Sequence, residues 1–401
     1  MLKNLLECKG WIVGAHSFNN QDINVELLID SRCRFFCPTC KEKLSTHCIR
    51  DIHVIDRSVI NHFTKLKIQT WQGFCKHCQS FHSFRPSYVH PRRMMTIRFM
   101  HYVSFLYSSM SAKNVSKLTG LSPASIRRVD ADVLADTLPK PHLDGLDSIL
   151  VDEKYLGSSF GFVTLVINAR TGEPLHLSKG KDQNALDEFF SQLTNDQKKS
   201  IRCVGLDRGN AYGASVRKNI PHADIAYDPF HLVSNMNDVV DKVRRDEVKQ
   251  APYGIKNLIV GNRYNLLRGN ENNNEDGLEK LQKLLCANES LNEVYVMKEQ
   301  FRFIFKGKDE NHAISRLSQW ISMAVKSSVT PLVRFAKNLV KSFNEVINSI
   351  RYNVTSAAIE STNAKIKRIQ SKACGLFNIT YLFQKIRQIY FISRNLYDQQ
   401  I

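Results

Sequence analysis

The chain has 401 residues, of which 43% are hydrophobic and 23% are charged, and its mean hydropathy is −0.30. These values exclude wholesale disorder and collagen-like repeats, and the length favours two or three domains. Lys and Arg number 56 against 38 Asp and Glu, which gives a formal net charge of +18. We therefore expect a polyanionic partner, nucleic acid before an anionic membrane surface.

No stretch of the sequence approaches the roughly 18 uninterrupted apolar residues that span a bilayer. The first fourteen residues carry an acid and a lysine within their apolar part and lack the apolar region of a secretion signal. We expect a cytoplasmic bacterial protein with no membrane partner, associated with the nucleoid when it is bound to DNA. In a reducing compartment, the ten cysteines indicate metal more than disulfides.

The amino-terminal third is the denser basic part, with 20 Lys and Arg against 10 Asp and Glu in residues 1–140. Residues 11–18 and 23–29 are predicted strands joined by a turn-prone, asparagine-rich segment. A further β-rich stretch, which includes residues 65–71, separates two Cys-x-x-Cys pairs. We predict a β-rich zinc-binding module over residues 1–90.

The two pairs are Cys37 with Cys40 and Cys75 with Cys78. Each pair presents two thiolates at one corner, and two such knuckles complete the tetrahedron of a structural zinc site with no open position for catalysis. Nearby substitutes as ligands are Cys33, Cys48 and His82. The alternative is that some of these cysteines are inert buried residues.

Residues 92–137 are predicted to be helical, with an apolar and aromatic run at 94–110. A short helix at about 112–119 reaches Gly120, and Ser122 caps a second helix that has Pro123 at its first position. This is the outline of a helix-turn-helix DNA-binding domain over residues 91–140. Its second helix offers Ser125, Arg127 and Arg128 to a DNA groove. A plain helical hairpin that only packs is the alternative.

After a proline-punctuated linker at 138–145, strands alternate with helices. We predict strands at 148–155, 160–168, 173–177, 201–207 and 223–228, and helices at 183–193 and 211–219. This β-β-β-α-β-α-β order is that of the ribonuclease-H-like fold. Residues 232–345 are predicted to be mostly helical with a loop at 269–277, and residues 356–397 to be helical again.

Asp152 and Asp207 each end an apolar strand, where a buried strand delivers a carboxylate to the rim of a sheet. Crowded carboxylates repel one another, and a divalent cation such as Mg²⁺ relieves the repulsion while keeping positions open for water and phosphate. Two such ions about 3.5–4 Å apart can activate water and stabilise a leaving oxygen.

A later helix offers a third acid. Glu360, Asn363 and Lys367 share one of its faces, and another face is formed by Ile359, Ile366 and Ile369. Taken alone, each acid is more commonly a surface or capping residue. The metal hypothesis therefore depends on their joint placement.

Over nearly its whole length the sequence resembles the insertion-sequence transposases of the ISL3 group, which carry an Asp-Asp-Glu catalytic domain. The resemblance includes the paired Cys-x-x-Cys module, the helix-turn-helix and the blocks at 151–153, 205–207, 221–231, 237–245, 358–367 and 375–378. The most specific blocks are the Asp-x-Phe-His of residues 228–231 and the Glu-x-x-Asn-x-x-Ile-Lys of residues 360–367.

The resemblance implies an α+β multidomain protein. Its parts are the zinc module, the helix-turn-helix, a ribonuclease-H-like α/β catalytic core at 141–231 and 346–401, and a helical insertion at 232–345. It also implies a metal-dependent DNA transposase whose catalytic residues Asp152, Asp207 and Glu360 hold two magnesium or manganese ions. Asp228 is the rival second acid, because residues 208–212 depart from the methionine-rich segment common in the family. Strand order favours Asp207, so that Asp228 and His231 support the site or cap the next helix.

In the reaction that we expect, the zinc module and helix-turn-helix bind the terminal inverted repeats of the element. Water attacks the phosphodiester at the element end, and the freed 3′-hydroxyl then attacks target DNA. Lys365, Lys367 and Arg368 are expected to contact phosphate, the alternative being a solvated helix face.

Because two ends of double-stranded DNA are handled together, a homodimer or larger assembly is expected by analogy. Two other functions stay open. One is a DNA-binding regulator that has lost cleavage, and the other is a structure-selective nuclease on the same fold.

Overall fold

The computed structural model describes residues 6, 9–19, 22–59, 62–158, 160–208, 211–307, 309–355, 357–372 and 378–393. Two compact units are formed, one containing the chain up to residue 139 and the other containing residues 140–370 and 377–390. Most of the predicted block at 375–378, and the predicted helical residues 394–397, lie outside the described residues.

The first unit begins with a mostly antiparallel sheet. Its strands are β1 (Trp11–Phe18), β2 (Asp22–Ile29), β3 (Ser45–Val59), β4 (His62–Cys75) and β5 (Ser80–Phe84). The order is β1-β2-β4-β3, and β5 adds to β4 beyond the end of its pairing with β2. Alternating side chains such as Val25, Leu27, Leu66 and Ile68 are fully buried on one face, as expected for a half-buried sheet.

Three helices follow in the same unit: α2 (Ile97–Ser109), α3 (Ala112–Thr119) and α4 (Pro123–Thr137). Gly120 ends α3 in the left-handed conformation, with φ +71°, which glycine adopts without steric cost. The hydroxyl of Ser122 accepts from the Ser125 N–H, and Pro123 occupies the first turn of α4. The predicted helix at 112–119 and the predicted cap at Ser122 are therefore confirmed, whereas the first helix begins at Ile97 rather than at residue 92.

The second unit contains a mixed sheet in the order β10-β9-β6-β7-β8. Its strands are β6 (Ser148–Tyr155), β7 (Phe162–Asn168), β8 (Pro174–Lys179), β9 (Cys203–Leu206) and β10 (Asp224–Tyr227). β6, β7 and β8 pair antiparallel, whereas β9 and β10 pair parallel to β6 and to each other. Each predicted strand is present: β6 has the predicted bounds, and the ends of the other strands differ from the prediction by at most two residues.

Helices α5 (Gln183–Ser191), α6 (Asn195–Ser200) and α7 (Tyr212–Asn219) belong to this sheet region. Leu186, Phe189 and Phe190 of α5 pack with Ile149 and Val166 of the sheet in one buried core. α6 is not predicted from the sequence, because none of its residues is buried and it has no apolar periodicity.

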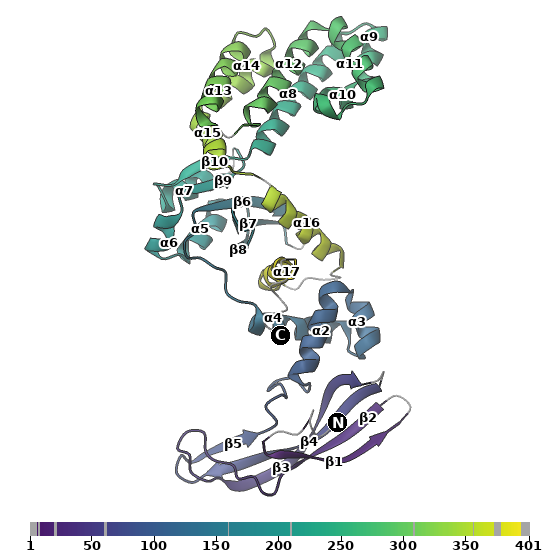
Figure 1. Cartoon of the computed structure of the whole chain (residues 1–401), viewed down its shortest axis with the longest axis vertical. Helices are drawn as coiled ribbons and strands as arrows, with labels where there is room; N and C mark the ends of the chain where they lie inside the picture. The colour runs from purple at the N-terminus through teal and green to yellow at the C-terminus, as the bar shows by residue number, and fades with distance from the viewer. Residues whose placement is uncertain are drawn as a thin grey trace. The chain divides into compact units, whose positions relative to one another are not determined.

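A long insertion of helices separates β10 from the last two helices (Figure 1). Its elements are α8 (Pro229–Gln250), α9 (Tyr253–Gly261), α10 (Arg263–Leu267), the 3₁₀ turn η1 (Asn270–Asn272), α11 (Glu275–Ala287), α12 (Glu289–Ile304), α13 (Glu310–Val325), α14 (Thr330–Val340) and α15 (Phe343–Arg351). Trp320, Phe301 and Phe335 pack together at its centre. The insertion therefore has a hydrophobic core of its own. The predicted loop at 269–277 is only partly correct, because it contains η1 and the start of α11.

The insertion returns to the sheet through α15. The Asn348 amide donates to the Ile225 carbonyl at 2.9 Å, and the Tyr352 hydroxyl donates to Asp224 at 2.6 Å. Both contacts reach β10, so the end of the insertion is tied to the edge strand from which the insertion departs.

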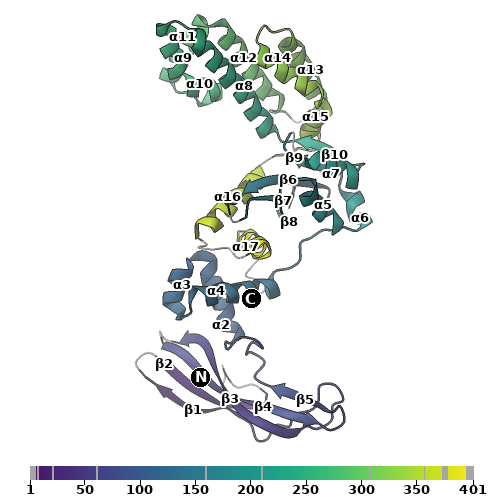
Figure 2. The same ribbon diagram turned by 180° about the vertical axis from the view of Figure 1, so that it is seen from behind.

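The last helices are α16 (Ala357–Lys372) and α17 (Ile379–Ile392). Ile359, Ile366 and Ile369 of α16 are buried and Glu360 and Lys367 are exposed, which confirms the two predicted faces. In both views α16 runs beside the sheet that contains β6 (Figure 1, Figure 2).

Candidate active site

Three aspartates follow the same pattern on three adjacent parallel strands. The residues directly before them, Val151 and Leu206, are buried in the sheet core, and Tyr227 packs against it. Because successive side chains of a strand point to opposite faces, Asp152, Asp207 and Asp228 all point to the other face.

The strand registers bring these aspartates level with one another. Leu150 pairs with Gly205, and Leu206 pairs with Tyr227. Continuing the two registers aligns Asp152 with Asp207 and Asp207 with Asp228 at the carboxyl ends of the strands. β9 lies between β6 and β10, so Asp207 is the middle acid of the three.

A small pocket opens at this edge of the sheet. Its lining contains Leu150, Val151, Asp152, Gly205, Leu206, Asp207, Asp228, His231, Val354, Thr355 and Ile359. His231, in the first turn of α8, lies with its Nε2 atom 3.2 Å from Asp207 Oδ1 and 3.7 Å from Asp228 Oδ2. Asp228 also begins α8, since its carboxylate accepts from the Phe230 N–H at 3.0 Å. Asp228 thus both caps a helix and contributes to the pocket.

The pocket carries excess negative charge. The pKa of Asp207 is raised to about 6, chiefly by burial; His231 acts to lower it, and the carboxylates of Asp152 and Asp228 act to raise it. Burial likewise raises the pKa of Asp228, with a contribution in the same direction from Glu360. Acids that are crowded and partly desolvated in this way favour either protons or a bound cation.

α16 supplies the remaining side of the site. The Asn363 amide donates to Asp152 Oδ2 at 2.5 Å, and Ile359 lines the pocket beside Val354. Glu360 lies one turn before Asn363 on the same face of the helix. The structure therefore brings Asp152, Asp207, Asp228 and His231 together, and it places Glu360 where its charge acts on Asp228.

The side chains at this edge suit a divalent cation. Carboxylate oxygens are the ligands preferred by Mg²⁺ and Mn²⁺, and Asp207, Asp228 and His231 each offer a ligand atom within 4.8 Å of the others. Within the described residues, the buried Asn363 Oδ1 atom accepts no hydrogen bond, so an acceptor beside Asp152 is left for a hydrated ion.

The basic residues of α16 differ in how exposed they are to solvent. Lys367 and Arg368 are exposed, and Lys365 is half-buried with its Nζ atom 6.0 Å from the centre of the Tyr390 ring of α17.

A second cluster lies in the first unit, where the two Cys-x-x-Cys pairs meet. The Sγ atoms of Cys37, Cys40, Cys75 and Cys78 all lie within 4.8 Å of one another, and two of these pairs are 3.9 and 3.4 Å apart. A tetrahedral zinc site with Zn–S bonds of about 2.3 Å has S–S edges of about 3.8 Å. The four thiols are therefore compatible with zinc.

The chemistry of these thiols agrees with their geometry. The backbone N–H of Cys40 lowers the pKa of Cys37 to about 6, whereas hydrogen bonding with the Cys40 thiol and burial raise the pKa of Cys78 to about 12. One thiolate forms readily and further thiolates at this spacing repel it, which a cation would relieve. The substitutes Cys33 and Cys48 contact Arg34 and Gln72 instead, and His82 Nε2 lies 3.4 Å from Cys37 Sγ.

The residues predicted to face a DNA groove all lie on α4. Arg128 is exposed, Arg127 is half-buried, and the Ser125 hydroxyl lies 3.0 Å from that of the capping Ser122. Ser125 is thus engaged in the helix cap.

Two contacts in and near the site are not predicted from the sequence. One is the bond from Asn363 to Asp152, although the spacing of Asn363 from Glu360 already indicated a shared face. The other joins Arg208, directly after Asp207, to the Asn338 carbonyl of α14 at 2.6 Å. No local pattern reveals this second contact, because 130 positions separate the two residues.

Carboxylates gathered at one edge of a mixed sheet are compatible with a metal-dependent DNA transposase of the Asp-Asp-Glu class. The family model described as transposase, for the ISL3 group, matches residues 149–386. The chain belongs to this family, which implies metal-dependent cleavage and strand transfer on DNA.

Named relatives are similar over most of their length. The transposase for insertion sequence element IS1001 of Bordetella parapertussis is 24% identical over 342 residues, which covers 84% of this chain and 83% of the relative. The transposase for insertion sequence element IS1557 of Mycobacterium tuberculosis (strain CDC 1551 / Oshkosh) is 25% identical over 306 residues, 70% of this chain and 68% of that protein. Across the described parts of the chain, helices long and apolar enough to cross a membrane are absent.

Proposed function

We propose that this transposase binds the terminal inverted repeats of an insertion sequence and that Asp152, Asp207 and Glu360 are its catalytic residues. The observation that carries the proposal is the alignment of Asp152 and Asp207 at the ends of adjacent parallel strands, with Asn363 of α16 bonded to Asp152. These three acids would hold two Mg²⁺ or Mn²⁺ ions, with Asp228 and His231 in support. When bound, such ions stabilise charge on the phosphate and lower the pKa of water.

The protein's own residues have distinct parts in this reaction. Asn363 fixes the orientation of Asp152, and His231 offsets the negative charge around Asp207. Lys365, Lys367 and Arg368 contact the DNA phosphates next to the scissile bond. Cleavage forms a bond from water oxygen to phosphorus and breaks the bond between that phosphorus and the 3′-oxygen of the element end. The freed 3′-hydroxyl then attacks a phosphorus of the target strand and displaces the 3′-oxygen bonded to it.

The proposed domains divide these tasks. Residues 1–90 form a zinc module, with structural zinc on Cys37, Cys40, Cys75 and Cys78, and residues 91–140 form a helix-turn-helix that reads DNA through Ser125, Arg127 and Arg128. Residues 141–231 and 346–401 form a ribonuclease-H-like core, interrupted by the helical insertion at 232–345. A homodimer or larger assembly holds the two element ends together.

The test is a strand-cleavage assay on double-stranded DNA taken from the borders of the coding region, with Mg²⁺ or Mn²⁺. We expect wild-type protein to nick at the border and to join the 3′ end to a second duplex, and Asp152→Ala to bind the DNA but not to cut it. Binding without cleavage by both proteins would indicate a DNA-binding regulator. Cleavage of branched DNA without joining would indicate a structure-selective nuclease.

A further inference from the structure

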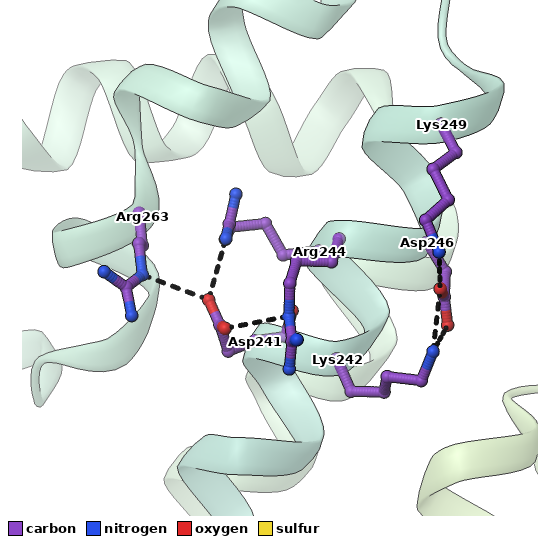
Figure 3. Close-up of polar contacts among 7 residues, drawn as sticks. Asp241, Lys242, Arg244, Asp246, Lys249 and Arg263 are labelled. Carbon is purple, nitrogen blue, oxygen red and sulfur yellow. Dashed lines mark hydrogen bonds and ion pairs between the residues drawn. The ribbon is translucent and has the colours of Figure 1, made fainter.

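Two groups of basic residues in the helical insertion differ in their partners. In the first group, acids neutralise them. Figure 3 shows Asp241 of α8 held by Arg244 and Arg263, at 2.9 and 3.2 Å, and Asp246 held by Lys242 and Lys249.

The same pairing recurs on α11. Lys280 pairs with Asp276 and Lys283 with Glu279, each at 2.6 Å and one helical turn apart. Such pairs offset their own charge within the helix and are what a surface helix needs for solubility and modest stability. They do not by themselves indicate a ligand.

The second group lies on α14, whose residues Thr330–Val340 include no acid. Arg334, Lys337 and Lys341 are all exposed, and within the described residues none of them forms an ion pair or a side-chain hydrogen bond. Their spacing of three and four residues places them on one face, which we call the α14 basic face. Like charges at this spacing repel one another, and a bound polyanion would offset that repulsion.

The dipole of α14 accounts for only part of this arrangement. Lysines near a helix carboxyl terminus are favourable, which explains Lys337 and Lys341. It does not explain Arg334, which lies in the middle of the helix. The carbonyl of Asn338, in the last turn of α14, already accepts hydrogen bonds from Arg208 and from the Ser342 hydroxyl.

The same bond from Arg208 ties the α14 basic face to the active site. Arg208 directly follows Asp207, and its Nη2 atom lies 2.6 Å from the carbonyl oxygen of Asn338, the neighbour of Lys337. The face extends for about 10 Å from Lys341 to Arg334 along α14. That length matches the axial rise of about three phosphates on one DNA strand.

We propose that the α14 basic face binds the phosphate backbone of duplex DNA next to the catalytic pocket. This inference rests on the proposed function, since it takes the pocket at Asp207 as the place where DNA is cut. It adds a DNA contact within the insertion, separate from the zinc module, the helix-turn-helix and α16. Contacts of this kind position the duplex and are independent of its sequence.

The test compares two full-length triple variants that lose the same formal charge. One is Arg334→Ala/Lys337→Ala/Lys341→Ala, which removes the α14 basic face. The matched control is Lys242→Ala/Lys280→Ala/Lys283→Ala, which removes acid-paired lysines of the same insertion. The Kd for a fluorescent duplex of mixed sequence is measured between about 50 and 200 mM salt, where phosphate contacts dominate. Circular dichroism establishes that each variant is folded.

We expect the α14 variant to lose on the order of 100-fold in affinity at about 0.1 M salt, and its plot of log K against log salt to be shallower by about 2–3. The control variant should stay within a few-fold of wild type. Arg334→Lys/Lys337→Arg/Lys341→Arg should restore binding, since it keeps the charges. If the triple α14 variant does not fold, Lys337→Gln and Lys341→Gln are used singly and should each flatten the slope by about 1.

Equal affinities and slopes for the α14 and control variants would overturn the proposal. That result leaves the proposed function intact if wild-type protein still cuts DNA. Conversely, a wild-type protein that binds the duplex and never cuts it would refute the proposed function, whereas the comparison of the two variants still decides the role of the α14 basic face.

Discussion

The hydrogen bond from Asn363 to Asp152 joins α16 to β6, the central strand of the sheet, and it connects residues that are 211 positions apart. A carboxylate that binds a metal gains from a partner that fixes its orientation, and loss of such a partner typically costs 10- to 100-fold in metal affinity or activity. In the proposed site, Asn363 therefore has a positioning role, and Asp152 is the residue that would bind the metal.

We expect Asn363→Ala to reduce DNA cleavage by about 10- to 100-fold, because Asp152 is then free to rotate. The loss should shrink as the Mg²⁺ concentration is raised, since weaker binding is overcome by mass action. Cleavage rates are measured over a Mg²⁺ titration. Ser361→Ala, at an exposed position of the same helix, is the control and should match wild type. An unchanged rate and Mg²⁺ dependence in Asn363→Ala would contradict this role.

Among the elements of the proposed site, β9 has little room for change at Gly205. A Cβ atom at Gly205 would lie 2.5 Å from Leu150 Cδ2 and 2.9 Å from Val354 Cγ1, so the strand can approach its neighbours only with glycine there. Asp207 lies two residues further on, and its alignment with Asp152 depends on this approach.

We expect Gly205→Ala to lower the free energy of unfolding by about 1–3 kcal/mol through overpacking. It should also reduce cleavage by more than its stability loss explains, because Asp207 moves away from Asp152. Chemical denaturation and cleavage at a temperature where the variant is folded test the two effects. For comparison, Gly254→Ala in α9 meets no atom within 4 Å, so it should leave both quantities near wild type. A fully stable, fully active Gly205→Ala protein would show that the packing is not needed.

The four-cysteine cluster of the first unit is compatible with a bound zinc ion. Cys37 is fully buried beside Cys75 and Trp71, so the proposed metal lies at the core of this part of the sheet. Cys37→Ser should lose the roughly one zinc per chain that a four-thiolate site binds, and with it most of the cooperative unfolding of the module. Elemental analysis and thermal unfolding measure this. Cys286→Ser, at an exposed cysteine of α11, serves as the reference. Protein purified without chelator and free of zinc would refute the site.

Local signals explain which elements the sequence predicts. Ser122, Pro123 and Gly120 mark the ends of α3 and α4 by capping chemistry that acts within a few residues. The strands of the second unit are apolar runs and are equally easy to predict. By contrast, α6 buries none of its residues, and its boundaries are set by the reciprocal cap of Thr194 and Gln197 rather than by periodicity.

At the scale of the whole molecule, the site requires information that no short segment contains. The acids at the strand ends are visible in the sequence, but their alignment comes from the parallel registers of β6, β9 and β10. The contact of Arg208 with Asn338 likewise depends on how the insertion folds back. The family resemblance supplies the roles of the residues, and the structure adds which of them lie side by side.

The proposed assembly leads to a prediction for the complete protein. If two element ends are cut within one dimer and both active sites must be intact, random mixing determines the yield. In an equal mixture of wild type and Asp152→Asn, only about one dimer in four has two wild-type subunits. We therefore expect cleavage of element ends to fall to about a quarter of the value for wild type at the same total concentration. Asp152→Asn removes charge from the pocket and leaves the α14 basic face unaltered, so DNA binding should persist.

The measurement is the initial yield of cut element ends, counted one end at a time, after the two proteins have been mixed and allowed to exchange subunits before DNA is added. A mixture of wild type with Ser361→Ala is the control and should keep full activity. A monomeric enzyme would instead give about half the yield, since each wild-type chain acts alone. A yield near one half, unchanged by protein concentration, would rule out the obligate pairing of active sites, because only shared assemblies let an inactive subunit silence its partner.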